Sequence, residues 1–435
     1  MHTIHIEKTA RVADKYDVVV CGGGPAGFIA AVAAARLGAS TALIERYGFL
    51  GGMATAGLIA PLSVFTYNGE KVIGGLPWDF VERLVGMGGG LVEEPLGNIA
   101  FDPELYKLCV QRMVQEAGVK VFAHSYISGC RQEGNEITHV IMENKSGTEA
   151  LEGRMFVDCT GDADLAHMAG VPMQPQNGEP LQPASLIFVL SGVDTDSPLI
   201  SQAMHHNRQG VNCHCLPIRE ALLARQQELG LPEFGGPWFC TLLHDGTVAV
   251  NMTRVAADAC DNRNFAAAEM HLREDAFRMA QILKEHFPEF RHSYISATAV
   301  QAGPRETRRI LGAHTITAAE YLNAVRYEDS VSRGAHPIDI HVANGPSQGC
   351  HFLEKPAYVP YRALYAHNFP NLLVGGRCIS ADRQAFASLR VQASCMGTGQ
   401  AAGVAAAQCV QSGKTVLQAD TAMLMATLRQ WGAVI

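Results

Sequence analysis

The chain has 435 residues, 48% of them hydrophobic and 17% charged, so it can bury a sizeable core in two or three domains. Its formal net charge of −8 disfavours nucleic acid and anionic membranes as partners, because both attract basic surfaces. The 12 cysteines include no C-x-x-C pair, which disfavours zinc ribbons and ferredoxin-type clusters and indicates the reduced thiols of a cytoplasmic protein.

A strand, a glycine turn, a helix and a second strand are expected between residues 16 and 45. The valine-rich stretch 16–21 is typical of a strand buried on both faces, and an alanine-rich helix follows to about residue 37. The N-terminus has no apolar core of the signal-peptide type, and glycines and a proline interrupt the apolar window 18–37. We therefore expect no membrane span.

The turn Gly22-x-Gly24-x-x-Gly27 has the spacing of a dinucleotide-binding loop. Gly22 permits a tight turn, Gly24 lets phosphates approach the backbone, and Gly27 lets the helix pack on the strand. The free N–H groups at the helix start favour a pyrophosphate. Glu45, after the strand 40–44, is placed to accept hydrogen bonds from two ribose hydroxyls, and its charge disfavours a 2′-phosphate. NAD and FAD both fit this unit.

Three later segments favour FAD. The glycine-punctuated segment 46–61 suits a chain that runs along an extended dinucleotide toward a flavin ring. Residues 154–166 read as a second buried strand that leads into a helix. Residues 371–407 read as a strand, a double glycine and a helix that begins near 396–399. The positive end of that helix could face the anionic edge of a reduced flavin.

The rest of the pattern divides the chain into two units. The expected elements are a helix within 98–118, a strand at 119–127, a hairpin turning at 145–147, strands at 185–193 and 246–255, and a helix at 266–287. We expect a discontinuous nucleotide-binding domain over 14–172 and 366–435. Residues 173–365 are expected to form a substrate domain on an antiparallel sheet.

These motifs resemble the FAD-dependent oxidoreductase family of the glutathione-reductase-like flavoproteins and, distantly, the flavoprotein subunits of succinate dehydrogenase and fumarate reductase. The resemblance rests on the segments 21–27, 45–55, 157–164, 303–312, 336–341, 358–364 and 371–407. It implies an α/β fold, with a discontinuous Rossmann-like FAD-binding domain and an inserted α+β substrate domain on a mainly antiparallel sheet.

The resemblance also implies which residues contact FAD. They are Gly22, Gly24, Pro25, Ala26, Gly27, Glu45, Arg46, Gly52, Met53, Ile127, Thr160, Gly161, Asp162, Gly376, Arg377, Gly397 and Gly399. Many members of the wider superfamily carry an acid after the glycine of the C-terminal strand, and this chain departs from that pattern with Arg377. The segment 51–57 offers no histidine for a covalent link, and we expect non-covalent FAD.

Candidate catalytic residues lie between 300 and 365, namely His341, Arg305, Arg362 and Tyr361, with His351 as a further candidate. In an extended segment Asp339 and His341 share one face, so the acid could orient the imidazole for proton transfer. A structural hydrogen-bonding role for His341 is the alternative. Arg305 suits a substrate carboxylate. Tyr361 and Arg362 could line the flavin face, although a packing role fits Tyr361 equally well.

Metal binding is not expected. Cys213-His214-Cys215 offers three ligands without an evident fourth, and His205-His206 reads as a surface pair.

The sequence favours a FAD-dependent dehydrogenase or reductase that transfers a hydride between a small organic molecule and FAD. No second glycine loop for NAD(P)H follows the first. A monooxygenase that uses NAD(P)H and oxygen is one alternative, and an electron-transfer or scaffold subunit without its own substrate is another. An electron-transfer partner protein and a homo-oligomer are both compatible with the sequence.

Overall fold

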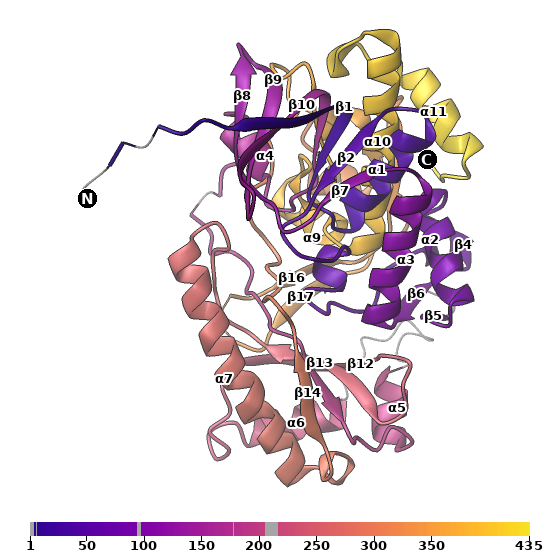
Figure 1. Cartoon of the computed structure of the whole chain (residues 1–435). Helices are drawn as coiled ribbons and strands as arrows, with labels where there is room; N and C mark the ends of the chain where they lie inside the picture. The colour runs from indigo at the N-terminus through magenta and orange to yellow at the C-terminus, as the bar shows by residue number, and fades with distance from the viewer. Residues whose placement is uncertain (1–3, 6, 94–96, 177, 205–215, 344) are drawn as a thin grey trace.

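The computed structural model describes residues 4–5, 7–93, 97–176, 178–204, 216–343 and 345–435. Figure 1 shows that it has an upper part built on a mixed sheet and a lower part built on an antiparallel sheet. The main upper sheet contains β1 (Arg11–Cys21), β2 (Thr41–Ile44), β7 (Lys120–Phe122), β8 (Tyr126–Glu133), β9 (Glu136–Asn144), β10 (Gly147–Asp158) and β19 (Leu372–Val374). Its helices are α1 (Pro25–Arg36), α2 (Leu76–Gly86), α3 (Pro103–Glu116), α4 (Asp164–Met168), α8 (Ala318–Leu322), α9 (Arg383–Leu389), α10 (Gln392–Ser412) and α11 (Thr421–Gln430). Short strand pairs complete this part: β3 (Thr66–Tyr67) with β4 (Glu70–Lys71), β5 (Gly90–Glu93) with β6 (Asn98–Phe101), β15 (Ser330–Gly334) with β18 (Ala357–Pro360), and β16 (Ile338–His341) with β17 (Gln348–His351).

The main sheet has the order β7-β2-β1-β10-β9-β8, with β19 also paired to β10. The pairs β1–β2, β1–β10, β2–β7 and β10–β19 are parallel, so the carboxyl ends of these strands meet at one edge. The first half of β10 pairs with β9 and its last residues pair with β19, which gives this strand three neighbours. The predicted Rossmann-like α/β fold is confirmed.

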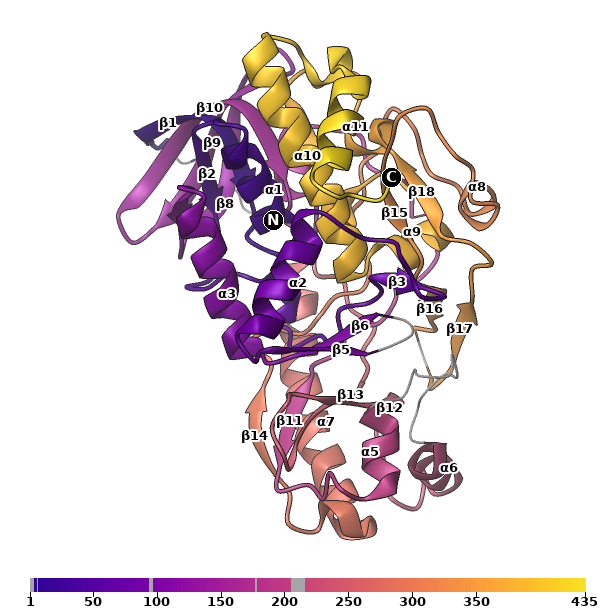
Figure 2. The same ribbon diagram turned by 90° about the vertical axis from the view of Figure 1, so that its right-hand side faces the viewer.

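Helix α1 packs on β1 and β2 of the sheet and against α10, and it is buried along nearly its whole length. A Cβ at Gly399 would lie 2.1 Å from the carbonyl oxygen of Ala26, and a Cβ at Gly403 would lie 2.1 Å from that of Ala30. Glycine at two positions one helical turn apart therefore lets the backbones of α1 and α10 touch. Figure 2 shows the two helices side by side.

Two predicted boundaries differ from the structure. The stretch 119–127 is not one strand, because His124 has a φ of 52° and redirects the chain from β7 into β8. The last long helix, α10, begins at Gln392 rather than near 396–399. Val391 is extended, with φ −72° and ψ 155°, and its carbonyl accepts the N–H of Cys395 to start the helix.

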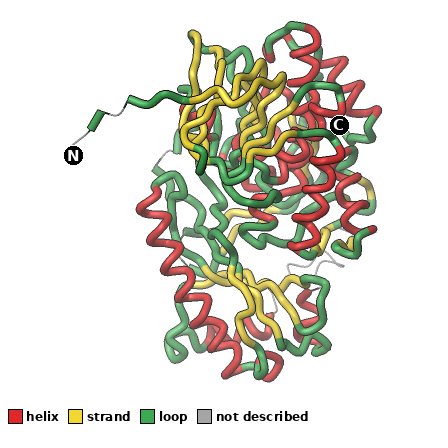
Figure 3. Tube along the Cα trace, in the orientation of Figure 1, coloured by secondary structure: helices red, strands yellow, loops and turns green. Residues whose placement is uncertain are grey.

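The lower part contains β11 (Phe188–Ser191), α5 (Pro198–Met204), α6 (Leu216–Ala224), β12 (Phe234–Thr241), β13 (Thr247–Thr253), α7 (Asn262–His286) and β14 (Tyr294–Thr298). Its sheet has the antiparallel order β12-β13-β11-β14. Helix α7 packs on this sheet through Ala276, Met279 and Leu283, and Figure 3 shows it as the long helix beside the strands. The expected antiparallel sheet with helices on it is thus confirmed.

The segment 173–365 contributes to the cores of both parts. Hydrophobic side chains between residues 184 and 302 form the clusters of the lower part, whereas those from Ile310 onward join the core of the upper part. The exact domain limits stay a prediction. No helix within the described ranges is long and apolar enough to cross a lipid bilayer. Cys213-His214-Cys215 and His205-His206 lie outside the described residues.

Candidate functional site

An open cavity, which we call the glycine cavity, lies at the carboxyl ends of the parallel strands, and the empty space within it and at its solvent-exposed mouth is about 980 Å³. It is lined by Gly22 after β1, Glu45 after β2, Thr160 after β10 and Gly375 after β19. Ligands of open α/β sheets bind at this edge, where the loops after the strands converge. The sheet topology therefore gathers residues that are far apart in sequence around one space.

The start of α1 forms one end of the glycine cavity. Gly24 caps the helix without a side-chain hydrogen bond, so the N–H groups of the first turn are available to an anion. Gly22 has a φ of +93°, and a Cβ there would lie 2.6 Å from the carbonyl oxygen of Cys159. A Cβ at Gly24 would meet only Gly52, at 3.7 Å. This exposed backbone beside a helix N-terminus fits a pyrophosphate.

Glu45 is held beside this turn as a buried acceptor. Its Oε2 accepts the N–H of Gly23 at 2.7 Å, and its Oε1 accepts the N–H of Tyr47 at 2.9 Å. Burial raises the pKa of Glu45, and the two backbone hydrogen bonds act in the opposite direction. The carboxylate has further lone pairs on the cavity wall that suit the hydroxyls of a ribose.

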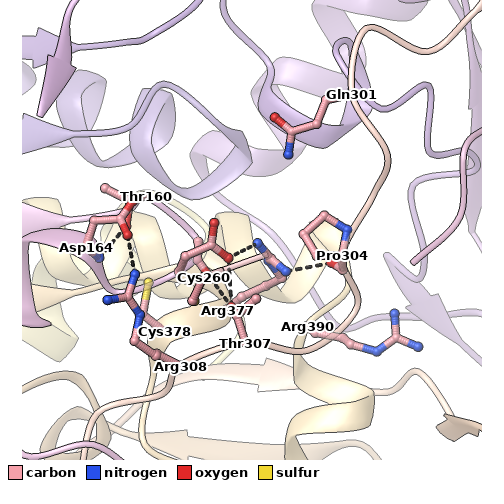
Figure 4. Close-up of polar contacts among 12 residues, drawn as sticks. Thr160, Asp164, Cys260, Gln301, Pro304, Thr307, Arg308, Arg377, Cys378 and Arg390 are labelled. Atoms are coloured by element: carbon pink, nitrogen blue, oxygen red, sulfur yellow. Dashed lines mark hydrogen bonds and ion pairs between the residues drawn. The ribbon is translucent and has the colours of Figure 1, made fainter. Parts of the chain in front are cut away.

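A polar network adjoins the glycine cavity, and Figure 4 labels its members Arg377, Thr307 and Pro304. Asp162 Oδ1 accepts hydrogen bonds from Arg377 Nη2 at 2.8 Å and from Thr307 Oγ1 at 2.7 Å. Arg377 Nη1 also donates to the carbonyl of Pro304 at 2.6 Å. The loop after β10 thus supplies the acid that pairs with Arg377.

A second ion pair lies beside this network. Arg308 donates a hydrogen bond to Asp164, which also lines the cavity (Figure 4). Burial, together with the nearby Asp162 and Asp158, raises the pKa of Asp164 to about 6. Arg308 is thereby engaged in a structural pair.

The N-terminus of α10 forms the other end of the glycine cavity. Arg390, Gln392 and Cys395 line it there, and no side chain caps the helix. Gln392 Nε2 donates to the carbonyl of Ile59 at 2.7 Å, whereas Gln392 Oε1 and Arg390 Nε are buried without a partner among the described residues. Buried polar atoms without a partner are unusual in native proteins, and a cofactor with matching groups would satisfy these two. This end thus presents polar groups and a positive helix terminus to a cofactor.

Most of the residues expected to contact the cofactor line the glycine cavity: Gly22, Gly24, Pro25, Ala26, Glu45, Arg46, Gly52, Met53, Ile127, Thr160, Gly161, Asp162, Gly376 and Arg377. Gly27, Gly397 and Gly399 do not line it. A Cβ on them would lie 1.7 Å from Gly22 O, 2.3 Å from Ser332 Oγ and 2.1 Å from Ala26 O, respectively. These three glycines permit close packing behind the cavity.

Several lining residues were missed by the sequence analysis, among them Tyr47, Ser125, Tyr126, Gln301, Arg390 and Gln392. Tyr47 follows Arg46, which directly follows the recognised acid Glu45, so the adjacent motif could have indicated it. Gln301 accepts hydrogen bonds from Arg46 and from Tyr47, across more than 250 positions of sequence. No local motif marks such a contact.

A second open cavity lies between the upper and lower parts, with about 1100 Å³ of empty space including its solvent-exposed mouth. We call it the histidine cavity, because its walls include His336 and His341. Its other walls come from the segment 60–67, from β6, from the strands β12 and β13, and from the strands β16 and β17 with the residues beside them. The lining residues include Tyr67, Asn98, Trp238, Asn251, Asp339, Gln348, Cys350 and Phe352. Arg390 of the glycine cavity donates to Asp339 of the histidine cavity. Gln392 of the glycine cavity donates to the carbonyl of Ile59, which precedes Ala60 of the histidine cavity. The two cavities therefore share parts of one wall.

Both ring nitrogens of His341 are engaged. Arg254 Nη2 donates to Nδ1 at 2.7 Å, and Nε2 lies 2.8 Å from Asp339 Oδ2. A guanidinium can only donate, so Nδ1 is unprotonated and Nε2 carries the proton that Asp339 accepts. Burial and the charge of Arg305 lower the pKa of His341 to about 3, against the opposing effect of Asp339. His341 is therefore neutral and oriented within this network.

His336 differs from His341 in its hydrogen bonding. Its Nδ1 lies 2.8 Å from the carbonyl oxygen of Pro337, which can only accept, so Nδ1 carries the proton. No described residue forms a hydrogen bond with its Nε2. Burial lowers the pKa of His336, with Asp339 opposing it, so the ring is neutral and Nε2 has a lone pair. Asp339 Oδ1 and Asn98 Oδ1 also have no partner within the described residues.

The other catalytic candidates line neither cavity. Arg305 is buried and donates to the carbonyl of Pro183 at 2.6 Å and to Ser185 at 2.9 Å. The Arg362 guanidinium donates two hydrogen bonds to Asp329, at 3.0 and 3.1 Å, and the Arg362 backbone N–H donates a third. Tyr361 is buried and donates to the carbonyl of Val416 at 3.0 Å, and His351 is exposed at the end of β17. Of the candidates, the structure brings His341 to a cavity wall.

The described residues contain no group of three or more His, Cys, Asp or Glu side chains placed to hold a metal ion.

The model of the family described as FAD dependent oxidoreductase matches residues 17–428. Dihydrolipoyl dehydrogenase from Trypanosoma brucei brucei is 56% identical over 41 residues, which are 9% of each chain. Digeranylgeranylglycerophospholipid reductase 1 from Methanococcoides burtonii is 25% identical over 201 residues, covering 42% of this chain and 46% of that protein. The matches thus span less than half the length of these curated relatives.

Among solved structures, a geranylgeranyl bacteriochlorophyll reductase-like protein from Thermoplasma acidophilum has a TM-score of 0.49 and 13% identity, over 96% of this chain and 83% of that one. OxyS anhydrotetracycline hydroxylase from Streptomyces rimosus has a TM-score of 0.44 and 13% identity, over 95% of this chain and 64% of that one.

Proposed function

The chain belongs to the FAD-dependent oxidoreductase family, and we propose that it transfers a hydride between FAD in the glycine cavity and a small organic substrate in the histidine cavity. FAD is its cofactor and is bound without a covalent link. The residues of the glycine cavity fit it. The uncapped start of α1 would bind the pyrophosphate, Glu45 a ribose, and the uncapped start of α10 the flavin end.

Bound FAD supplies the acceptor or donor of the hydride. The protein has to hold the substrate against the flavin, exclude water and move the accompanying proton. The histidine cavity has side chains for these tasks. Trp238 and Phe352 add apolar surface, while His336 and Asp339 add polar atoms that can exchange or accept protons.

The contact between Arg390 and Asp339 supports this assignment most directly. Arg390 lines the glycine cavity and Asp339 lines the histidine cavity, and Arg390 Nη2 lies 3.3 Å from Asp339 Oδ2. The second cavity therefore adjoins the α10 end of the first, where the flavin end of FAD is assigned. A substrate in the histidine cavity would lie beside the redox-active part of the cofactor.

An anaerobic absorbance spectrum of the purified full chain tests the proposal. We expect flavin bands that persist after NADH or NADPH is added and bleach with a small-molecule substrate from a panel of alcohols, amines and carboxylic acids. Bleaching by NAD(P)H, followed by substrate-dependent oxygen uptake, would replace the proposal with a monooxygenase. Bleaching by a partner protein alone would indicate an electron-transfer subunit.

Blocking the histidine cavity separates cofactor binding from substrate binding. Cys350 lines the cavity from β17, and the next residue, His351, is exposed and lines neither cavity. Cys350→Phe should retain the flavin bands but lose substrate-dependent bleaching, because the larger ring occupies the substrate space. His351→Phe is the matched control and should bleach like the wild type. Equal bleaching of both variants would place the substrate elsewhere.

A further inference from the structure

The histidine cavity presents several hydrogen-bond acceptors that the protein leaves without donors. Asn98 Oδ1 and Asp339 Oδ1 are buried and have no partner among the described residues. The Nε2 lone pair of His336 is a third such acceptor, because its Nδ1 is bound to the carbonyl of Pro337. These atoms come from β6, from β16 and from the segment before β16, and all three residues line one cavity. A ligand that binds there has to supply O–H or N–H donors.

The charges around the cavity disfavour ionic ligands. The Asp339 carboxylate has a free oxygen at the wall and would repel an anion. Behind this wall lie Arg390, which binds Asp339, and Arg254, which binds His341. Arg305 is also close enough to depress the pKa of His341. A substrate ammonium group would be repelled by these three guanidinium groups, and a carboxylate would bring no donor for the unpaired acceptors of the cavity, so a neutral donor such as a hydroxyl fits best.

Asp339 stays ionised in this setting. Burial acts to raise the pKa of Asp339, but the hydrogen bond from His341 and the charge of Arg390 outweigh it and hold the pKa well below its usual range. The carboxylate is thus a strong hydrogen-bond acceptor and a weak base. It suits the binding of a hydroxyl rather than the removal of its proton.

His336 is the side chain suited to take that proton. Its tautomer is fixed by the carbonyl of Pro337, and its own carbonyl accepts a hydrogen bond from Ser388, which anchors the backbone. His341, the histidine favoured by the sequence pattern, has its Nδ1 lone pair occupied by Arg254 and its Nε2 proton occupied by Asp339. His341 is therefore a positioning residue for Asp339.

We propose that the histidine cavity binds a neutral, hydroxyl-rich substrate of the polyol type and that His336 Nε2 accepts the hydroxyl proton when a CH–OH group is oxidised. This inference rests on the proposed function above. The C–H bond breaks and its hydride goes to FAD, which is reduced by two electrons. The O–H bond breaks and its proton goes to His336, and the carbon becomes a carbonyl. Asn98 and Asp339 bind neighbouring hydroxyls.

The substrate class is tested first on the wild-type holoenzyme. Glycerol, myo-inositol and glucose are added anaerobically, beside amines and carboxylic acids of similar size, and flavin bleaching and thermal unfolding are recorded. We expect a polyol to bleach the flavin and to raise the unfolding midpoint. Bleaching by an amine or an acid alone would overturn the inference and leave the proposed function intact. The absence of bleaching by any compound would overturn both.

The proton acceptor is tested with His336→Asn and the control His351→Asn. We expect His336→Asn to keep its FAD and its polyol-induced thermal shift but to lose about 10²- to 10⁴-fold in the rate of flavin reduction. The wild-type rate should fall at acid pH as His336 is protonated, whereas the variant should lack this limb. Added imidazole should restore part of the rate. If His336→Asn does not fold, His336→Gln takes its place. An unchanged rate, or an unchanged acid limb, would overturn the assignment.

Discussion

Arg390 and Asp339 join the two cavities of this protein. Arg390 lies between α9 and α10 on the wall of the glycine cavity, and its Nη2 contacts both the carbonyl and the carboxylate of Asp339, at 3.2 and 3.3 Å. Asp339 lies on the wall of the histidine cavity and accepts the Nε2 proton of His341. The side chain that shapes the flavin end of the first cavity thus also fixes the acid of the second.

Removal of this link should impair turnover more than folding. In Arg390→Gln the Asp339 carboxylate loses a charged donor and its fixed position, and we expect the rate of flavin reduction to fall about 100-fold. Stopped-flow absorbance measures that rate. Arg131→Gln is the control, because Arg131 forms an exposed surface pair with Glu133. A rate equal to that of the control would contradict the positioning role.

Glu45 should contribute strongly to FAD affinity. Each of its oxygens accepts a backbone N–H, so the amide of Glu45→Gln would place a donor against one of those donors. Loss of a charged hydrogen bond costs about 1.5–3 kcal/mol, and we expect the dissociation constant of FAD to rise about 10- to 100-fold. Calorimetric titration of the deflavinated protein measures this constant. Glu136→Gln, at the exposed start of β9, is the control and should bind FAD like the wild type.

Gly399 should be required for the contact between α1 and α10. The Cβ of Gly399→Ala would lie 2.1 Å from the carbonyl oxygen of Ala26, so one of the two buried backbones has to shift. We expect a loss of about 1–3 kcal/mol in stability, seen as a lower thermal midpoint and weaker FAD retention. Gly86→Ala is the matched helical control, because a Cβ there meets nothing within 4 Å. Equal midpoints for the two variants would show that the helices adjust freely.

The nucleotide unit was predictable because its signals are local. The strand, the glycines, the helix and Glu45 follow one another within about 30 residues. In the structure they form β1, the turn, α1 and the residue after β2 in that order, and Gly22, Gly24 and Glu45 line one cavity. Gly399 shows the limit of this reasoning. The resemblance to the flavoprotein family implied a cofactor contact for Gly399, but its packing against Ala26 depends on how α1 and α10 cross, which no local pattern encodes.

The histidine cavity was predictable only in part. Alternation along an extended segment correctly placed Asp339 and His341 on one face, and they share a hydrogen bond. The state of His341 depends on Arg254, which lies 87 residues earlier and comes from the lower part. The acceptor at Asn98 comes from β6, in yet another segment. Such sites are assembled by the tertiary fold, so the sequence could name candidates without assigning their roles.

His341 should make the protein less stable in acid. Its pKa is about 3 in the folded state against 6.5 ordinarily, so between these values the unfolded chain binds more protons than the folded one. The stability contributed by neutral His341 is therefore complete above pH 6.5 and is lost as the pH falls toward 3. For one such proton, the free energy of unfolding falls by about 1.4 kcal/mol per pH unit within this window.

The variant His341→Gln lacks this titration, so its thermal midpoint should decline less between pH 7 and pH 5 than that of the wild type, even if it is lower at pH 7. Scanning fluorimetry of the holoprotein in matched buffers measures both midpoints. His351→Gln removes an exposed histidine outside both cavities and should follow the wild-type curve. If the thermal midpoint of His341→Gln declines between pH 7 and pH 5 as much as that of the wild type, the ring of His341 is not held neutral between Arg254 and Asp339. The hydrogen-bond directions assigned to the network would then have to be reversed.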